Sequence, residues 1–192
     1  MILWTLLTFS LIFQLSFGGI TISQDDCQWL TATDFDANVL KCDGNEVVVG
    51  ACGGGSNRDC PDNSAHQLKC CAIPGYYYSD CDVFGEEYGI SNDCRDHGET
   101  RLLEASCNSG ANHDCHGFST ITECCTGHLE GKEVGPTAEC TWEYSGHGSP
   151  LECGRSDEVV VVRCGSGGDL DCPGNTSHGI LCCELDFVAI IN

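Results

Sequence analysis

Residues 164–183 read CGSGGDLDCPGNTSHGILCC, and the cysteine spacing of this stretch decides the fold of the chain. Seven residues separate its first two cysteines, and an adjacent cysteine pair ends it. The stretches CGGGSNRDC at 52–60 and CNSGANHDC at 107–115 have the same first spacing, and each also leads to an adjacent pair. A pattern that recurs at a fixed period indicates one small structural unit used three times.

Two more cysteines precede each of these stretches, so every repeat contains six. The repeats use all eighteen cysteines of the chain: Cys27, Cys42, Cys52, Cys60, Cys70 and Cys71; Cys81, Cys94, Cys107, Cys115, Cys124 and Cys125; Cys140, Cys153, Cys164, Cys172, Cys182 and Cys183. An even number in each repeat predicts three disulfides within every repeat and none between repeats, without selecting among the fifteen pairings that six cysteines allow. We therefore expect three tandem cysteine-rich modules, at 27–71, 81–125 and 140–183.

Each repeat spans only about 45 residues, and a unit of that size rarely folds around a hydrophobic core alone. Three disulfides supply the missing stability, at roughly 2–4 kcal/mol per bridge. Runs rich in β-branched or apolar residues predict one strand in each repeat at 46–49, 102–103 and 158–162, and a second at 67–69, 121–123 and 179–181. The expected fold class is a small disulfide-rich β protein with short antiparallel strands.

The spacing Cys-x7-Cys-x9-Cys-Cys in 164–183 resembles the second half of the sea-anemone sodium-channel toxins and, more loosely, the β-defensins. This resemblance implies three defensin-like modules in which the first cysteine pairs with the fifth, the second with the fourth and the third with the sixth. In the first repeat these bridges are Cys27–Cys70, Cys42–Cys60 and Cys52–Cys71. The broader profile of acidic cysteine-rich repeats is similar to that of invertebrate shell or skeletal matrix proteins.

Residues 1–18 form an uncharged apolar run that ends in Ser16-Phe17-Gly18, with small residues at the −3 and −1 positions of a signal-peptidase site. We interpret this run as a signal peptide; the alternative is a membrane anchor, since the length just suffices to span a bilayer. Secretion through an oxidising compartment lets eighteen cysteines pair and stay paired. The expected protein is extracellular and begins at Gly19.

The chain carries 29 Asp and Glu against 8 Lys and Arg, a net charge of −21. Such a surface repels nucleic acid and anionic membranes, and it attracts cations and basic partners. We therefore expect calcium, a mineral surface or a basic extracellular partner, with no nucleic acid and no membrane insertion. An enzyme is not expected, because no histidine falls in a recognisable nucleophile motif and every cysteine belongs to the disulfide set.

An Asx-x-Asp pair precedes the fourth cysteine of each repeat: Asn57 and Asp59, Asn112 and Asp114, Asp169 and Asp171. Residues two apart on an extended segment point to the same face, so each pair offers oxygen ligands for weak calcium binding. The alternative is that these residues only form hydrogen-bonded turns. No other cofactor is expected. Asn175-Thr176-Ser177 is an N-glycosylation sequon in a loop between cysteines, which predicts a surface acceptor at Asn175.

Aromatic residues and linkers complete the sequence-based expectations. Trp29, Phe84 and Trp142 follow the first cysteine of each repeat, and we interpret each as the main apolar plug of a small core. The linkers 72–80 and 126–139 contain Gly and Pro and predict turns or spacers. Tyr76-Tyr77-Tyr78 in the first linker predicts packing between adjacent units, or else an exposed contact.

Two functions are consistent with these features. The first is a structural extracellular matrix protein, in a mineralised shell or skeleton, with weak and multivalent calcium binding. The alternative is a secreted binding effector, such as a toxin-like channel modulator or a protease inhibitor. Effectors of that kind act through one exposed loop with a basic or aromatic anchor, and no loop of the sequence stands out in this way. The matrix function is therefore favoured.

Overall fold

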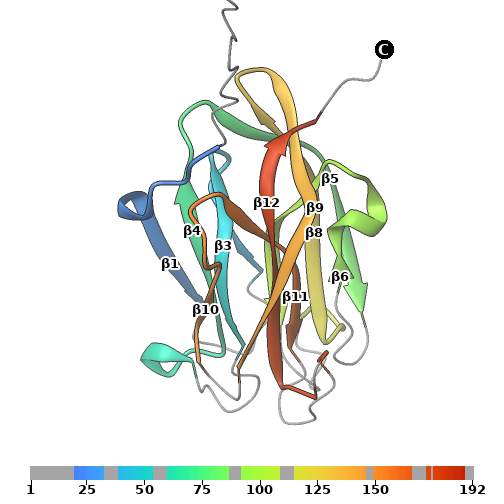
Figure 1. Cartoon of the computed structure of the whole chain (residues 1–192). Helices are drawn as coiled ribbons and strands as arrows, with labels where there is room; N and C mark the ends of the chain where they lie inside the picture. The colour runs from blue at the N-terminus through green and yellow to red at the C-terminus, as the bar shows by residue number, and fades with distance from the viewer. Residues whose placement is uncertain are drawn as a thin grey trace, which may run out of the picture.

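The computed structural model describes residues 20–32, 39–53, 60–86, 92–108, 115–145, 149–165, 172–173 and 175–188. These residues are mostly β-strand, with three 3₁₀ turns at Gln24–Asp26 (η1), Pro61–Asn63 (η3) and Cys94–His97 (η4) (Figure 1). No helix within the described ranges is long and apolar enough to span a membrane. The predicted class, a small disulfide-rich β protein, is confirmed.

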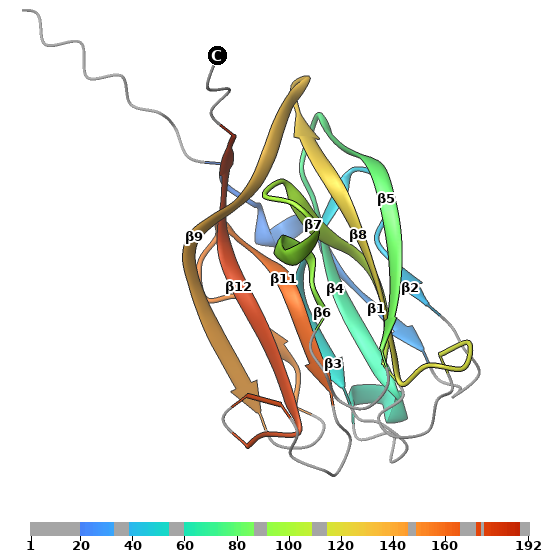
Figure 2. The same ribbon diagram turned by 90° about the vertical axis from the view of Figure 1, so that its right-hand side faces the viewer.

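Three four-stranded antiparallel arrangements make up the molecule (Figures 1 and 2). The first has the order β1 (Cys27–Ala32), β4 (His66–Ala72), β3 (Glu46–Gly53), β10 (Leu151–Glu152). The second has the order β5 (Tyr76–Glu86), β8 (Thr120–Leu129), β7 (Arg101–Asn108), β2 (Leu40–Lys41). The third has the order β9 (Lys132–Ser145), β12 (His178–Phe187), β11 (Glu158–Gly165), β6 (Asn92–Asp93). The second and third are continuous through the hairpin β8–β9, where Gly127–Leu129 pairs with Lys132–Val134.

The fourth strand of every sheet comes from a different repeat. Strand β2 of the first repeat pairs with β7 of the second, β6 of the second pairs with β11 of the third, and β10 of the third pairs with β3 of the first. The three two-residue strands occupy equivalent positions, because each directly precedes the second cysteine of its repeat. The repeats therefore form a closed ring in which each lends a strand to the next. Whether any repeat folds independently as a module remains a prediction.

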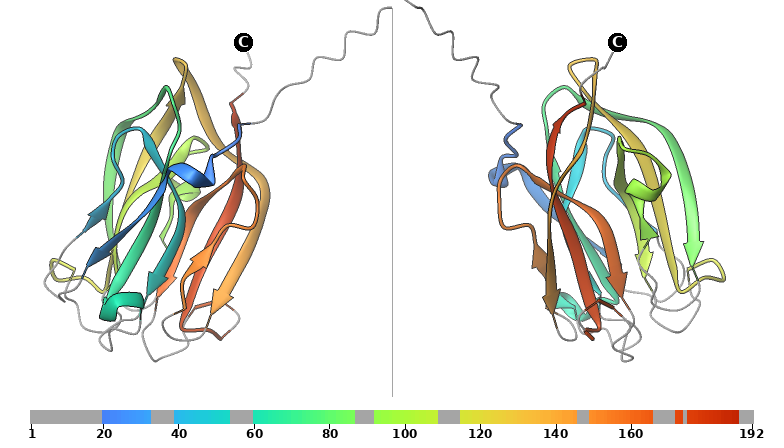
Figure 3. Two further views of the ribbon diagram at one scale, coloured as in Figure 1. Left: turned by 90° about the vertical axis from the view of Figure 1, so that its left-hand side faces the viewer. Right: turned by 45° about the vertical axis from the view of Figure 1, so that its right-hand side comes forward.

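The middle of the ring is made by β3, β7 and β11, the strands that the valine- and leucine-rich runs predict. All eight residues of β3 and of β11 are buried, so these strands are covered on both faces. One cluster joins Val48, Leu103 and Val160 with buried cysteines, and another joins Val47, Leu102 and Val159. Since each cluster draws equivalent residues from all three repeats, the repeats share one core. Figure 3 shows the sheets gathered around it.

The nine disulfides are confined to the repeats, as predicted, but their pairing differs from the one that the toxin resemblance implies. The first cysteine pairs with the sixth, the second with the fifth and the third with the fourth: Cys27–Cys71, Cys42–Cys70, Cys52–Cys60; Cys81–Cys125, Cys94–Cys124, Cys107–Cys115; Cys140–Cys183, Cys153–Cys182, Cys164–Cys172. The reason is the strand order. In the first repeat, register places Cys27 directly opposite Cys71 across β1 and β4.

Three further expectations are wrong. The strands are not all short, since β5, β8, β9 and β12 run for 10–14 residues. These strands absorb most of both linkers, which the sequence had predicted as turns or spacers. The aromatic residues Trp29, Phe84 and Trp142 are half-buried rather than central, because the shared valine and cysteine core occupies the middle. Within the tyrosine run, Tyr76 is buried while Tyr77 is exposed, as alternation along a strand requires.

Candidate functional site

The predicted calcium residues Asn57, Asp59, Asn112, Asp114, Asp169 and Asp171 lie outside the described residues. The structure does place the strands that lead into these three segments. Arg163 at the end of β11 donates from Nη2 to the Cys52 carbonyl of β3 at 2.6 Å and from Nη1 to Ser106 Oγ of β7 at 3.3 Å. The three equivalent strand ends therefore meet around one guanidinium.

Arg163 is fully buried, and no carboxylate of the described residues lies within ion-pair distance of it. Burial in a medium that solvates charge poorly lowers the pKa of Arg163 to about 9. The positive charge of Arg163 repels a divalent cation, so it disfavours cation binding where the ends of β3, β7 and β11 meet.

His178 of β12 lies beside this guanidinium, also buried. Its Nδ1 is 2.9 Å from the Cys164 carbonyl oxygen and its Nε2 is 3.2 Å from the Ala51 carbonyl oxygen. Burial, reinforced by the positive charge of Arg163, lowers the pKa of His178 to about 4. A neutral imidazole has one N–H, so it donates to only one of the two carbonyls, and we assign the proton to Nδ1 at the shorter contact.

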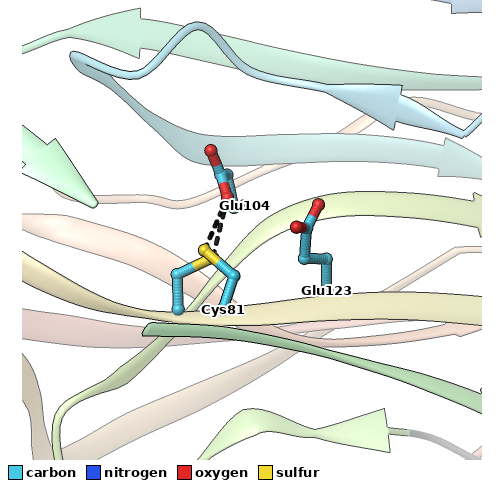
Figure 4. A group of neighbouring side chains, drawn as sticks. Cys81, Glu104 and Glu123 are labelled. Atoms are coloured by element: carbon cyan, nitrogen blue, oxygen red, sulfur yellow. Dashed lines mark hydrogen bonds between the residues drawn. A yellow bond between two sulfur atoms is a disulfide. The ribbon is translucent and has the colours of Figure 1, made fainter. Parts of the chain in front are cut away.

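The structure brings together one group of ionisable side chains that the sequence did not reveal (Figure 4). Lys41 of β2 places Nζ 3.2 Å from Glu104 Oε2 and 3.1 Å from Glu123 Oε2. Glu104 is buried, and desolvation raises its pKa although Lys41 opposes the shift. Its Oε2 lies 2.7 Å from Cys125 Sγ and 3.3 Å from Cys81 Sγ.

This group is a junction between repeats rather than a metal centre. Cys81 and Cys125 form a disulfide, so their sulfurs are not available as thiolate ligands. The two carboxylates already share the ammonium group of Lys41, which reaches them from the preceding repeat. A second junction carries the same kind of pair with the charges exchanged. There Lys69 of β4 is 2.7 Å from Glu152 of β10.

The two ion pairs distinguish the junctions from one another. Lys41, Asp93 and Glu152 are equivalent residues on the three donated strands, and Lys69 and Glu123 are equivalent residues on the accepting sheets. Lys41 on the first repeat's sheet would face Lys69, and Glu152 on the second repeat's sheet would face Glu123. Like charges repel there, so the charge pattern favours the observed order of the ring.

A hollow of about 550 Å³ lies beside the turn of the β8–β9 hairpin and the start of β5, lined by Tyr77, His128, Gly131, Lys132, Glu133 and Val188. The Tyr77 ring stacks on the His128 imidazole with centroids 4.8 Å apart. Lys132 is exposed, has no ion pair among the described residues, and lies 5.4 Å from the centre of the Phe187 ring. This aromatic and basic surface belongs to a hairpin that sequence reasoning assigned to a spacer.

A serine–histidine contact joins β5 to β8 nearby, with Ser79 Oγ 2.7 Å from His128 Nε2. Ser79 Oγ also lies 3.1 Å from Asp80 Oδ2, to which its hydroxyl donates. A hydroxyl has one proton, so His128 Nε2 is the donor in this chain and Ser79 Oγ the acceptor. That polarity is the reverse of what activates a serine nucleophile. The contact is therefore structural.

A second hollow, of about 410 Å³, lies on the other side of Val188, between η4 and the start of β9. Its polar lining comes from Arg95, Glu99 and Asp186. Arg95 is already held by Asp93, with Nη2 2.6 Å from Oδ2.

Asn175, the predicted glycosylation acceptor, is exposed in a turn with φ of 57°. Its side chain is therefore accessible to modification.

No protein-family model matches the sequence, and neither does any curated protein. The fold and the site together define a small β protein locked by nine disulfides, in which three repeats exchange strands around one core. Sequence reasoning missed Arg163, the junction ion pairs and the hairpin hollow. The sequence contains one signal for Arg163, because this arginine interrupts the apolar run VVVVRC at 159–164 of the third repeat.

Proposed function

We propose that this protein is a secreted structural protein of an extracellular matrix, with weak and multivalent calcium binding at an acidic surface. One observation carries the proposal: nine disulfides hold a closed ring whose net charge is −21. Disulfides of this density suit an oxidising extracellular setting. They also suit a protein that persists for a long time outside the cell, because a chain with short loops between bridges resists unfolding and proteolysis.

Five of the seven described Lys and Arg side chains are in ion pairs with Asp or Glu, so they offset part of the acidic surface locally. The remaining carboxylates are spread over all three repeats. Calcium binding of millimolar affinity is typical of extracellular sites with few ligands and little rigidity. A mineral surface presents many calcium ions at once, and many weak contacts add up to stable attachment.

Titration calorimetry with Ca²⁺ tests this proposal, at low and at physiological ionic strength. We expect weak binding at several sites that diminishes with salt, because exposed charges are screened over about 8–10 Å. The triple substitution Asp59→Asn, Asp114→Asn and Asp171→Asn removes one acid from each predicted site. A matched control removes three exposed acids elsewhere, as Asp25→Asn, Asp62→Asn and Glu130→Gln.

A larger loss in the first triple variant than in the control supports three specific sites. Equal losses support a diffuse acidic surface instead, and they overturn the assignment to the Asx-x-Asp pairs. An absence of Ca²⁺ binding at low salt overturns the calcium function as a whole.

The hairpin hollow favours a second candidate function, a soluble binding effector. It joins an exposed tyrosine of β5 to a histidine and an exposed lysine of the β8–β9 hairpin, the lysine having no ion pair in the part of the chain that the structure describes, and this composition is that of an interface hot spot. Tyr77→Ala and Lys132→Ala should then reduce inhibition of a target protease or channel by about tenfold or more. The exposed Val83→Ala serves as the control, since Val83 lies on the same strand β5 and is 64% exposed.

A further inference from the structure

The ring of repeats has one junction that differs from the other two. At the junctions of the first repeat with the second and of the second with the third, the repeat that donates the strand directly precedes, along the chain, the repeat that accepts it. At the closing junction, β10 of the third repeat pairs with β3 of the first, Leu151 with Ala51 and Glu152 with Gly50. The first and third repeats are linked only through the second repeat, so their contact is an association of distant parts of the chain.

The closing junction is specific as well as non-covalent. Cys153 donates its backbone N–H to the Val49 carbonyl at 2.9 Å, and Lys69 pairs with Glu152 at 2.7 Å. A Cβ on Gly50 would lie 2.7 Å from the Leu151 carbonyl oxygen, so glycine is required for β10 to approach. A second contact joins Ile22 N–H to the Ser156 carbonyl at 2.6 Å, with Ile22 buried in the core.

No disulfide crosses this junction. All nine bridges lie within single repeats, and each donated strand is tied to its own repeat by the bridge between the second and fifth cysteines. The third repeat can therefore leave the first while its own three disulfides stay intact. Any third repeat of the same sequence presents the same β10, the same Leu151 and the same Glu152.

A hinge for this movement exists between the second and third repeats. They are joined by the β8–β9 hairpin (Figure 2), whose turn is Glu130-Gly131, with φ of 53° and 77°. The pairing across this hairpin is limited to Gly127–Leu129 with Lys132–Val134. If the turn opens and β11 leaves β6, β8 and β9 become one extended segment that carries the third repeat away from the first two.

We propose that the closing junction also forms between two copies of the chain, so that the third repeat of one copy completes the first repeat of another. Reciprocal exchange gives a dimer with six repeats in which every junction is the same as in the monomer. Exchange that does not close on itself gives a head-to-tail polymer, as expected of a heterologous interface. Such assembly goes beyond the proposed calcium function and does not depend on calcium.

Charge reversal at the closing junction provides the test. The Lys69→Glu variant places a carboxylate opposite Glu152, and the Glu152→Lys variant places an ammonium group opposite Lys69. Like charges therefore oppose closure in either single variant. When the two variants are mixed, each junction of a reciprocal dimer joins opposite charges. The double variant Lys69→Glu with Glu152→Lys restores an opposite pair within one chain and is the control for correct folding.

The variants, given different masses by isotopic labelling, are unfolded in guanidinium with their disulfides intact and refolded together at high protein concentration. Native mass spectrometry then counts the dimers. We expect mixed dimers in excess of random pairing, and a double variant that behaves like the unmodified chain. Random pairing of the two single variants overturns the closing junction as the contact, and an absence of dimers in every sample overturns exchange.

The hinge gives an independent measurement on full-length chains. Gly131→Val places a β-branched residue at a φ of 77° in open space, so the change strains the closed hairpin alone. The matched control is Gly154→Val, which also meets nothing within 4 Å and has no positive φ. We expect Gly131→Val to raise the dimer fraction about tenfold, the factor that left-handed strain of this kind corresponds to. Equal dimer fractions in the two variants overturn the hairpin as the hinge.

Discussion

Replacement of Arg163 by methionine should leave the stability of this protein unchanged or increase it. Methionine fills a similar volume without a charge, and the guanidinium of Arg163 is fully buried with no carboxylate partner among the described residues. Replacement of buried ionic groups by apolar side chains of similar size is often neutral or stabilising.

The magnitude follows from the pKa. Burial lowers the pKa of Arg163 from the ordinary value of an arginine to about 9, and at 1.36 kcal/mol per pKa unit the charged form costs the folded state about 5 kcal/mol. The hydrogen bonds to the Cys52 carbonyl and Ser106 Oγ have a charged donor and return roughly 1.5–3 kcal/mol each. The difference predicts that Arg163→Met changes the free energy of unfolding by between about −1 and +2 kcal/mol.

Guanidinium-induced unfolding of the oxidised protein, followed by tryptophan fluorescence, measures this difference. A second readout is alkaline pH. Because the folded pKa lies below the unfolded one, the cost is fully present below pH 9 and decreases as pH rises above about 9, so stability should rise with pH relative to Arg163→Met. Arg163→Lys keeps the charge and should not be stabilised. A loss of more than about 1 kcal/mol in Arg163→Met would refute the reasoning, since the guanidinium would then be a net stabilising group.

Three further predictions concern pH, disulfides and the closing strand. The pKa of His178 is about 4 in the folded protein and 6.5 when unfolded, so its contribution to stability is fully present above pH 6.5 and decreases by about 3 kcal/mol as pH falls to about 4. The His178→Gln variant should lack this decrease in acid unfolding. The same loss of stability in acid for the variant and the unmodified chain would contradict the prediction. Replacing Cys52 and Cys60 with alanine, which opens a separation of 8 residues, should cost roughly 2.5 kcal/mol, against roughly 3.5 kcal/mol for Cys42 and Cys70 at a separation of 28; denaturant melts would rank the two variants, and the reverse order would show that native packing outweighs loop entropy. Gly50→Ala places a Cβ 2.7 Å from the Leu151 carbonyl and should destabilise the protein by about 1–3 kcal/mol, whereas Gly44→Ala in open space should be near neutral in the same melts; equal effects would show that β10 does not need glycine at this point.

The sequence by itself determined the repeats, the confinement of nine disulfides within them, and the central strands. These features are local. Cysteine spacing is a property of each repeat, and the runs Val47–Val49 and Val159–Val162 favour strands wherever they pack. The exposure of Asn175 in a turn likewise follows from short-range sequence around the sequon.

The tertiary structure alone decided the pairing of the cysteines and the exchange of strands. Six cysteines fit fifteen pairings at the same spacing, and the choice depends on register, such as Cys27 opposite Cys71. The two-residue strands Leu40–Lys41, Asn92–Asp93 and Leu151–Glu152 are too short to leave a periodic signal. Their partners lie in other repeats, so the energy that holds them comes from residues 50 or more positions away. The junction ion pairs and the buried environment of Arg163 arise only when the ring closes.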